Sequence, residues 1–216
     1  MMDVKLRITE VFCSLQGEAR TVGRPTTFIR LTGCPLRCHY CDTEYAFSGG
    51  ELLTLSEILD RVRRFGVPHV TVTGGEPLAQ VEVRQLMELL VEAGFKVSLE
   101  TSGALSIADI DPNVSVVMDL KTPGSGESHR NLIKNISLLK SSDQVKFVIT
   151  SREDYEWARF QVDQFGLDRR VDDVLFSPSF GEVQPTMLAA WILEDRLPVR
   201  MQLQLHKILW GDKPGV

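Results

Sequence analysis

Short runs of β-branched and other apolar residues alternate along this chain with longer stretches of helical periodicity, which limits the folds open to it. The predicted strands are Thr26–Leu31, His69–Thr73, Lys96–Glu100, Ser115–Asp119, Gln144–Ile149 and Asp173–Ser177, with a further strand or hairpin near Lys5–Val11. The predicted helices are Thr54–Phe65, Val81–Ala93, Asn131–Leu139, Arg152–Phe165 and Thr186–Asp195. Because near-continuous apolar strands joined by helices are typical of a parallel sheet, we expect one α/β domain over residues 1–216.

The number of strands narrows the architecture further. Six strands are too few for a closed eight-stranded barrel, which takes about 250 residues. A partial (β/α) barrel of about six parallel strands or an open doubly wound sheet remains, and both bind ligands beyond the carboxyl ends of their strands. The polar segments that follow five of the strands are Gly33–Thr43, Gly74–Pro77, Thr101–Gly103, Leu120–Pro123 and Pro178–Ser179. We therefore expect the chemistry of the chain at that edge of the sheet.

Charge and hydropathy exclude several classes of protein. The formal net charge of −5 does not suit a nucleic-acid binder, which normally presents a basic face. No apolar run approaches the roughly 18 residues of a membrane span. The first residues, MMDVKLRITE, lack the basic start and apolar core of a signal peptide. We therefore expect a cytoplasmic protein that binds neither nucleic acid nor a membrane.

Three of the four cysteines lie close together in GCPLRCHYCDT, which begins at position 33. Four cysteines are too few for a disulfide framework, and thiols in a reducing compartment are better read as metal ligands. The spacing Cys34-x3-Cys38-x2-Cys41 allows structural zinc, with His39 or a distant residue as fourth ligand. It also allows a [4Fe–4S] cluster held at three corners, whose fourth iron stays open for a substrate or cosubstrate. Cys13 stands apart, and we interpret it as a small buried hydrophobic residue.

The same spacing, with Tyr40 directly before the last cysteine, resembles the signature of the radical S-adenosylmethionine (SAM) superfamily. The resemblance implies that Cys34, Cys38 and Cys41 hold a [4Fe–4S] cluster whose open iron binds the amino and carboxylate groups of SAM. It also implies cleavage of SAM to a 5′-deoxyadenosyl radical, which abstracts a hydrogen from the substrate. In such an enzyme the cofactor carries the hard chemistry, and the protein orients the reactants and excludes water.

Flanking segments narrow the resemblance. FCSLQGE at 12–18, FIRLTGC at 28–34 and CDT at 41–43 are similar to the 7-carboxy-7-deazaguanine synthase family, and the similarity continues through TGGEP at 73–77 to QLHK at 204–207. The resemblance implies a trimmed barrel, a homodimer and an electron donor such as flavodoxin or ferredoxin. It implies contraction of the ring of 6-carboxy-5,6,7,8-tetrahydropterin with loss of ammonia, in queuosine biosynthesis, with SAM regenerated as a cofactor.

The resemblance also assigns residues to SAM, to the substrate and to magnesium. The residues it places around SAM are Tyr40, Cys41, Asp42, Gly75, Glu76, Asp119, Leu120, Lys121, Ser177, Pro178, Ser179 and Phe180. The residues it places around the pterin are Leu15, Gln16, Gly17, Glu18, Arg30, Thr73 and His206. Thr43 is the implied Mg²⁺ ligand, and substrate oxygens complete the shell of the ion.

The chemistry of these residues supports part of the assignment. Gly74 and Gly75 lack a Cβ, so their backbone can approach a ligand closely. Glu18 suits the guanidine-like end of a pterin. The fork of Arg30 suits a substrate carboxylate, although an internal ion pair would also satisfy it. From the residues alone, His206 fits a packing role slightly better than the pocket, and the family pattern favours the pocket.

The chain departs from the family pattern after the Gln-x-His-Lys segment, because it continues from residue 208 to 216. We expect a tail that either folds inward, with Val216 or Asp212 supplying a carboxylate to the substrate site, or is disordered. Two other functions also stay open. An enzyme that installs a glycyl radical on a partner protein shares the cysteine spacing but does not need SLQGE or CDT. A zinc-stabilised binding module predicts a colourless protein with one bound zinc.

Overall fold

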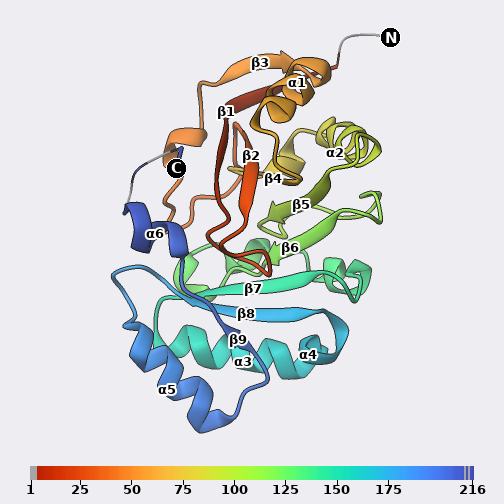
Figure 1. The fold of residues 1–216 in the computed structure, drawn as a ribbon. Helices are drawn as coiled ribbons and strands as arrows, with labels where there is room; N and C mark the ends of the chain where they lie inside the picture. Colours follow the sequence, from red (N-terminus) through yellow and green to blue (C-terminus); the bar gives the residue numbers. More distant parts are fainter. Residues whose placement is uncertain (1–3, 212, 214) are drawn as a thin grey trace.

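One open sheet of nine strands runs through the residues that the computed structural model describes, which are 4–211, 213 and 215–216. The strands are β1 (Lys5–Leu15), β2 (Pro25–Leu31), β3 (Glu51–Thr54), β4 (His69–Gly74), β5 (Lys96–Thr101), β6 (Ser115–Asp119), β7 (Gln144–Ile149), β8 (Asp173–Pro178) and β9 (Arg200–Met201). Their order in the sheet is β3-β1-β2-β4-β5-β6-β7-β8-β9, which Figure 1 shows from one end of the molecule to the other.

The parallel strands follow one another in chain order, without the reversal of a doubly wound sheet, which confirms a partial barrel. All six predicted strands are present, and together with β9 they run parallel from β2 to the far edge. β1 pairs antiparallel with both β2 and β3. Among the described residues no pairing joins β3 to β9, so the sheet does not close.

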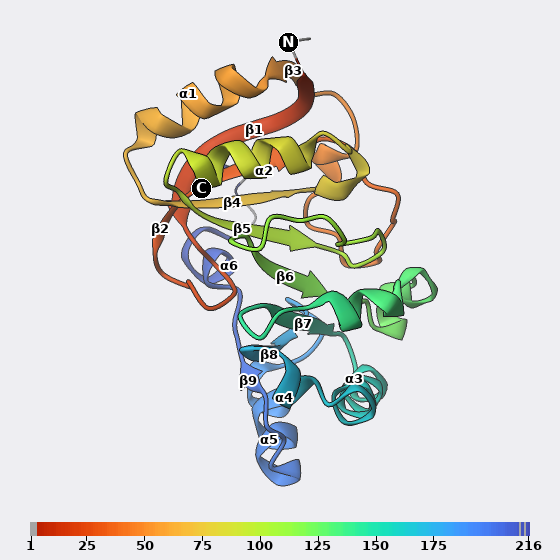
Figure 2. The same ribbon diagram turned by 90° about the vertical axis from the view of Figure 1, so that its right-hand side faces the viewer.

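The structure describes six α-helices, most of which cover the outer face of the sheet. They are α1 (Leu55–Phe65), α2 (Val83–Glu92), α3 (Arg152–Phe165), α4 (Leu167–Arg170), α5 (Pro185–Asp195) and α6 (Leu205–Trp210). Short 3-10 segments occupy Glu44–Ala46, Pro77–Ala79, Pro123–Ser125, Ser128–Arg130 and Ile133–Leu138. Figures 1 and 2 show α1 to α4 on one side of the sheet and α6 on the opposite, inner side. None of the described helices is long and apolar enough to cross a membrane.

The outer helices bury an apolar core against the strands. Ile58 of α1, Leu86 of α2 and Tyr155 of α3 are fully buried in it. α1 begins with the predicted capping box, in which the Thr54 hydroxyl accepts from the Glu57 amide and the Glu57 carboxylate accepts from the Thr54 amide. Because each large apolar side chain contributes about 1.5–3 kcal/mol when buried, this layer holds the sheet in place behind the inner face.

The segment 131–139 is not the helix that its periodicity predicted. It forms the 3-10 segment Ile133–Leu138. Asn135 explains the difference, because its side chain is buried and bonded to a neighbouring loop. Its Nδ2 donates to the carbonyls of Gly103 and Leu105, and its Oδ1 accepts from the amide of Ile107. These bonds hold the backbone against the segment that follows β5.

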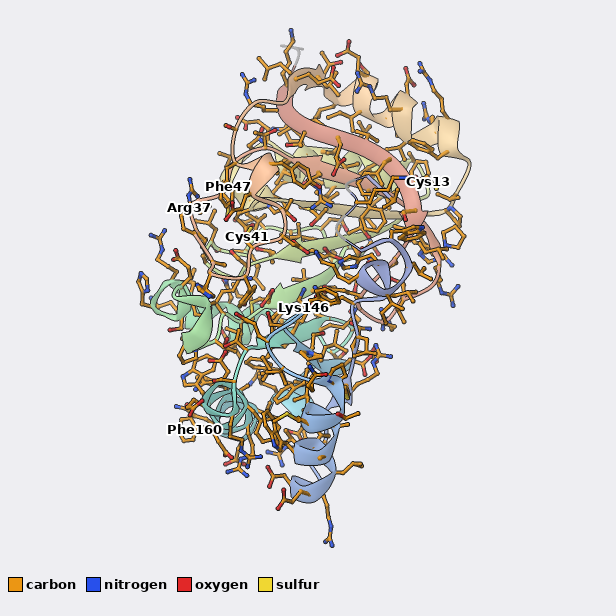
Figure 3. The ribbon with its side chains drawn as sticks, turned by 90° about the vertical axis from the view of Figure 1, so that its left-hand side faces the viewer. Cys13, Arg37, Cys41, Phe47, Lys146 and Phe160 are labelled. Carbon is orange, nitrogen blue, oxygen red and sulfur yellow. The ribbon has the colours of Figure 1, made fainter. Side chains whose placement is uncertain are left out.

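The prediction of a buried Cys13 was also wrong, because the thiol is exposed. Val11 is the last residue of β1 that packs against the core, and Cys13 lies beyond it. Figure 3 shows Cys13 well apart from Cys41. The alternation of apolar residues along β1 therefore continues beyond the part of the strand that packs against the core.

The loop between β1 and β2 spans the opening of the partial barrel. The Ala19 amide donates to Gln202 Oε1 at 2.6 Å, and Gln202 Nε2 donates back to the Ala19 carbonyl at 2.9 Å. The Arg20 amide donates to Gln144 Oε1 of β7 at 2.7 Å. Side-chain contacts thus bridge the gap that strand pairing leaves open, and they hold residues 15–18 against the inner face.

Candidate active site

The cysteine loop follows β2 at the carboxyl edge of the parallel sheet, as predicted. Cys34, Cys38 and Cys41 are free, partly buried thiols that line one cavity. The His39 amide donates to the Ser125 carbonyl at 3.0 Å and ties the loop to the segment after β6. Burial raises the pKa of all three thiols, that of Cys38 to about 11. A bound cation is therefore needed to keep them as thiolates near neutral pH.

The donor set fits a cluster better than a single zinc ion. In the part of the chain that the structure describes, no three His, Cys, Asp or Glu side chains lie close enough to hold one metal ion. His39, the candidate fourth zinc ligand, is largely exposed and lies 3.7 Å from Glu182. Three thiols around a shared cavity match the three protein corners of a [4Fe–4S] cluster.

A cavity of about 580 Å³ gathers most of the predicted site residues on the inner face, and Figure 3 marks its cysteine side at Cys41. This volume lies within the roughly 300–1,000 Å³ of small-molecule sites. The predicted residues that line it are Leu15, Gln16, Gly17, Glu18, Arg30, Cys34, Cys38, Tyr40, Cys41, Asp42, Thr43, Thr73, Gly75, Asp119, Lys121, Ser179, Phe180 and His206. The remaining four, Glu76, Leu120, Ser177 and Pro178, are buried outside that lining.

Glu76 braces the wall of the cavity. Its carboxylate accepts from the Leu78 amide at 3.0 Å, the Thr101 hydroxyl at 2.9 Å, the Ser102 amide at 2.7 Å and the Ser102 hydroxyl at 2.5 Å. The side chain is fully buried. Because four donors satisfy this carboxylate within the protein, its contact with SAM stays a prediction.

Gly74 and Gly75, the glycines before Glu76, allow a close approach of protein backbone, whereas we expected a close approach of a ligand. A Cβ at Gly75 would lie 2.4 Å from the Gly33 carbonyl oxygen, and one at Gly74 would lie 2.5 Å from the Leu31 carbonyl oxygen. The close neighbour is therefore the backbone at the start of the cysteine loop. Without a Cβ at either position, the end of β4 can lie directly against that loop.

Asp119 and Lys121 form an ion pair of 2.9 Å on the β6 side of the cavity. Burial opposes charge on both groups, but each partner outweighs it, so the pKa of Asp119 is lowered and that of Lys121 is raised. Lys121 Nζ lies 5.6 Å from the centre of the Tyr40 ring. Asp119 Oδ1 and the Tyr40 hydroxyl are buried without a hydrogen-bond partner among the described residues. Unpaired buried polar atoms beside a cavity fit a polar ligand such as SAM.

Two carboxylates line the other side: Glu18, which is buried, and Glu100, which is half-buried. Burial opposes ionisation of Glu18, but Lys146 Nζ lies 2.5 Å away and lowers the pKa of Glu18. Burial raises the pKa of Glu100, which accepts from Gln16 Nε2 and the Thr73 hydroxyl, each at 3.1 Å. The cavity therefore presents carboxyl oxygens in two different electrostatic settings to the N–H groups of a ligand.

Arg30 lines the cavity and has an acidic neighbour. Its Nε donates to Glu10 Oε1 at 2.7 Å, so the internal ion pair considered from the sequence is present. This bond uses one edge of the guanidinium group. The pair therefore leaves room for a ligand carboxylate at the other edge.

α6 joins the substrate side of the cavity. Gln204 Nε2 donates to Glu18 Oε1 at 2.8 Å just before the helix begins. The His206 ring packs so closely on Gly17 that a Cβ there would lie 2.2 Å from His206 Nδ1. His206 is therefore a packing residue and a lining residue at once, and Gly17 makes this possible.

The same helix reaches the cysteine loop through Asp42. Lys207 Nζ lies 3.5 Å and His206 Nε2 3.9 Å from the Asp42 carboxylate, and the Thr43 hydroxyl donates to it at 2.7 Å. Burial opposes ionisation of Asp42, but these partners hold its pKa well below the usual range. Beyond the helix, Val216 also lines the cavity, whereas position 212 lies outside the described residues.

The polar residues that line the cavity include several that sequence reasoning did not assign to the site, among them Glu100, Lys146, Gln204 and Lys207. Lys146 carried a signal, because it is a lone charge inside the apolar strand QVKFVI. Figure 3 shows it on the inner face with Cys41. Glu100 stands near the carboxyl end of β5, at the edge where we expected ligands. The other two flank His206.

Comparison with known proteins gives the class. Residues 28–140, which contain the cysteine loop and the strands from β4 to β6, match the radical SAM superfamily. The protein is thus a radical SAM enzyme, which uses a [4Fe–4S] cluster and SAM.

Individual relatives narrow the class to one family. The 7-carboxy-7-deazaguanine synthase of Koribacter versatilis is 43% identical over 95% of this chain and 97% of its own length. That of Chlorobaculum tepidum is 42% identical over 99% of both chains. The crystal structure of QueE from Escherichia coli has a TM-score of 0.76 at 25% identity and covers 94% of this chain and 95% of its own. The chain belongs to the 7-carboxy-7-deazaguanine synthase family.

Proposed function

We propose that this enzyme converts 6-carboxy-5,6,7,8-tetrahydropterin to 7-carboxy-7-deazaguanine with release of ammonia, as a step of queuosine biosynthesis. Relatives that carry this synthase name span nearly the whole chain. The observation that carries the proposal is one cavity that joins three thiols to two carboxylates and an arginine. The substrate has N–H donors at its guanidine-like end and a carboxylate at the other, and these groups complement that lining.

The cofactors would bind on the side of the cavity that the three cysteines line. Cys34, Cys38 and Cys41 would hold the [4Fe–4S] cluster, and Asp119 and Tyr40 would bind SAM. Together the cluster and SAM supply a 5′-deoxyadenosyl radical for hydrogen abstraction. Asp119 Oδ1 and the Tyr40 hydroxyl, both without partners in the described residues, pair with polar groups of SAM. The surrounding walls exclude water from the radical.

The opposite side orients the pterin. Glu18, kept ionised by Lys146, accepts from the guanidine-like end, with Glu100 beside it. Arg30 binds the carboxylate at the other end of the ring. His206 closes the site over Gly17. Holding the reacting carbon in one orientation is worth several orders of magnitude in rate, because entropy is lost on binding rather than in the reaction.

A magnesium ion belongs to this proposal through Thr43. The Thr43 hydroxyl lines the cavity next to Asp42, and Mg²⁺ needs few protein ligands when substrate oxygens complete its shell. The ion would hold the substrate carboxylate and stabilise negative charge. Thr43→Ala should weaken the dependence of the rate on Mg²⁺ and leave the iron content unchanged. Loss of the cluster in this variant would show instead that Thr43 is structural.

The proposal also includes a homodimer, an electron donor such as flavodoxin or ferredoxin, and a cytoplasmic location. Free thiols that must stay reduced for iron favour a reducing compartment. Light scattering after size exclusion tests the dimer. Turnover with each reduced donor in place of a chemical reductant tests the donor.

The decisive experiment is anaerobic reconstitution with iron and sulfide, followed by incubation with SAM, reductant, Mg²⁺ and the carboxylated pterin. We expect 7-carboxy-7-deazaguanine and ammonia in equal amounts, detected by mass spectrometry and an ammonia assay. Cys38→Ala serves as the cluster-free control. An intact cluster that cleaves SAM without forming the deazaguanine would refute this substrate and leave the superfamily assignment standing.

A further inference from the structure

The mostly buried carboxylate of Glu10 binds Arg30 from outside the cavity lining. Glu10 on β1 is the register partner of Arg30 on β2, and its Oε1 accepts from Arg30 Nε at 2.7 Å. The same Oε1 accepts a second hydrogen bond, from the Tyr45 hydroxyl at 2.8 Å. Arg30 and Tyr45 line the cavity, whereas Glu10 does not. The carboxylate therefore acts on the arginine from outside the ligand space.

Two aromatic rings restrain the same guanidinium group. Its central carbon lies 5.9 Å from the centre of the Phe12 ring and 5.8 Å from that of Tyr45, within the range of cation–π attraction. Phe12 is itself stacked on Phe28, with centres 5.0 Å apart and planes 12° apart. A side chain held at Nε and between fixed neighbours has little rotamer freedom left to lose when a ligand binds.

The edge that stays available can bind a carboxylate through two hydrogen bonds. Among the described residues, the side-chain hydrogen bond of Arg30 is the one that its Nε donates to Glu10. The two Nη atoms form the end-on edge of the fork, which binds a carboxylate through two parallel hydrogen bonds. Glu10 thus occupies the side of the arginine and leaves this end to the cavity.

We propose that Glu10, assisted by Tyr45, is a positioning residue that presents the Nη edge of Arg30 to the substrate carboxylate. It thereby makes this end of the cavity selective for carboxylated pterins over pterins that lack the group. The inference rests on the proposed function, because that function supplies the carboxylate. It adds a reason why the arginine is ready to bind before the ligand arrives.

The test measures Kd and KM for 6-carboxytetrahydropterin, and Kd for tetrahydropterin without the carboxylate, on reconstituted enzyme under anaerobic conditions. Glu10→Ala should raise both constants for the carboxylated ligand about tenfold to a hundredfold, since a small misplacement of a clamp is costly, with less change in kcat. The Kd of the ligand without the carboxylate should not change. Glu10→Gln keeps an acceptor for Nε and should restore the affinity to within about threefold.

Tyr45→Phe gives a milder variant in case Glu10→Ala does not fold. It removes one hydrogen bond to Glu10 Oε1 and should raise KM about threefold. Glu51→Ala is the matched control, because it removes another arginine–carboxylate pair, with Arg61, that lies outside the cavity lining. This control should leave both ligands unaffected.

A double-mutant cycle decides whether Glu10 acts through Arg30. The double variant Glu10→Ala/Arg30→Ala should bind the carboxylated pterin no more weakly than Arg30→Ala alone. Additive losses, or equal weakening of both ligands by Glu10→Ala, would overturn this inference while the proposed function stands. Unaltered enzyme that binds neither pterin would overturn the two together, whereas equal binding of both pterins would overturn this inference alone.

Discussion

Replacing Glu76 by glutamine separates two roles for this residue, a brace within the protein and a contact with SAM. The carboxylate accepts four hydrogen bonds, three of them from Thr101 and Ser102. A carboxamide keeps one oxygen, which accepts about two bonds, and brings an NH₂ group toward the remaining donors. The hydroxyls can turn to accept from it, but a backbone amide cannot. A buried donor without an acceptor costs about 1–3 kcal/mol, so we expect Glu76→Gln to lower the free energy of unfolding by about 2–4 kcal/mol.

Urea unfolding of the cluster-free protein measures this loss. With a slope of about 3 kcal/mol per molar urea, the midpoint should fall by roughly 1 M without a change in slope. Glu51→Gln, at an exposed carboxylate, is the control and should leave the midpoint unchanged. A wild-type midpoint in Glu76→Gln would refute the brace. If SAM binding, measured by equilibrium dialysis, were lost at that unchanged stability, Glu76 would be a ligand contact instead.

Three further variants test other parts of the site. Gly17→Ala places a Cβ on the His206 ring and should raise KM for the pterin about tenfold, whereas in a His206→Ala background it should add little, as steady-state kinetics will show. Cys13→Ser should keep the iron content and visible absorbance of the wild type, since the thiol is exposed and apart from the cysteine loop; a loss of iron would make it a ligand. Lys146→Met removes the cation that lowers the pKa of Glu18, so burial then raises that pKa. The protonated acid should therefore appear as pH falls, and KM should rise toward acid pH in this variant and not in the wild type.

The six parallel strands could be predicted from the sequence because each is a short run rich in β-branched and other apolar residues. The segment 131–139 could not, because its apolar periodicity is that of a helix while buried Asn135 bonds to the loop after β5. A single polar side chain with three tertiary bonds outweighs a weak local preference. These bonds reach the loop at residues 103–107, so the sequence of the segment 131–139 does not by itself indicate them.

The residues of the site also fall into those that the sequence could predict and those that it could not. The thiols could be predicted because the cysteine loop carries all three in one short motif. Lys146 and Glu100 reach the cavity through the register of the sheet, which sets them opposite residues far along the chain. A role for Glu10 could not be predicted, because Glu10 meets its partner Arg30 only when β1 pairs with β2. Pairwise contacts between strands carry information that a reading of one segment at a time does not contain.

The bridge between the loop after β1 and the segment after β9 has a consequence for synthesis in the cell. Ala19 and Gln202 are 183 positions apart, and Glu18 and Gln204 are 186 apart. At translation rates of about 5–20 residues per second, the first partner of each pair waits roughly 10–40 seconds for the second. The cysteine loop and the first parallel strands leave the ribosome within that interval. The pterin side of the cavity, which needs both Glu18 and Gln204, therefore cannot be completed until synthesis of the chain is nearly finished.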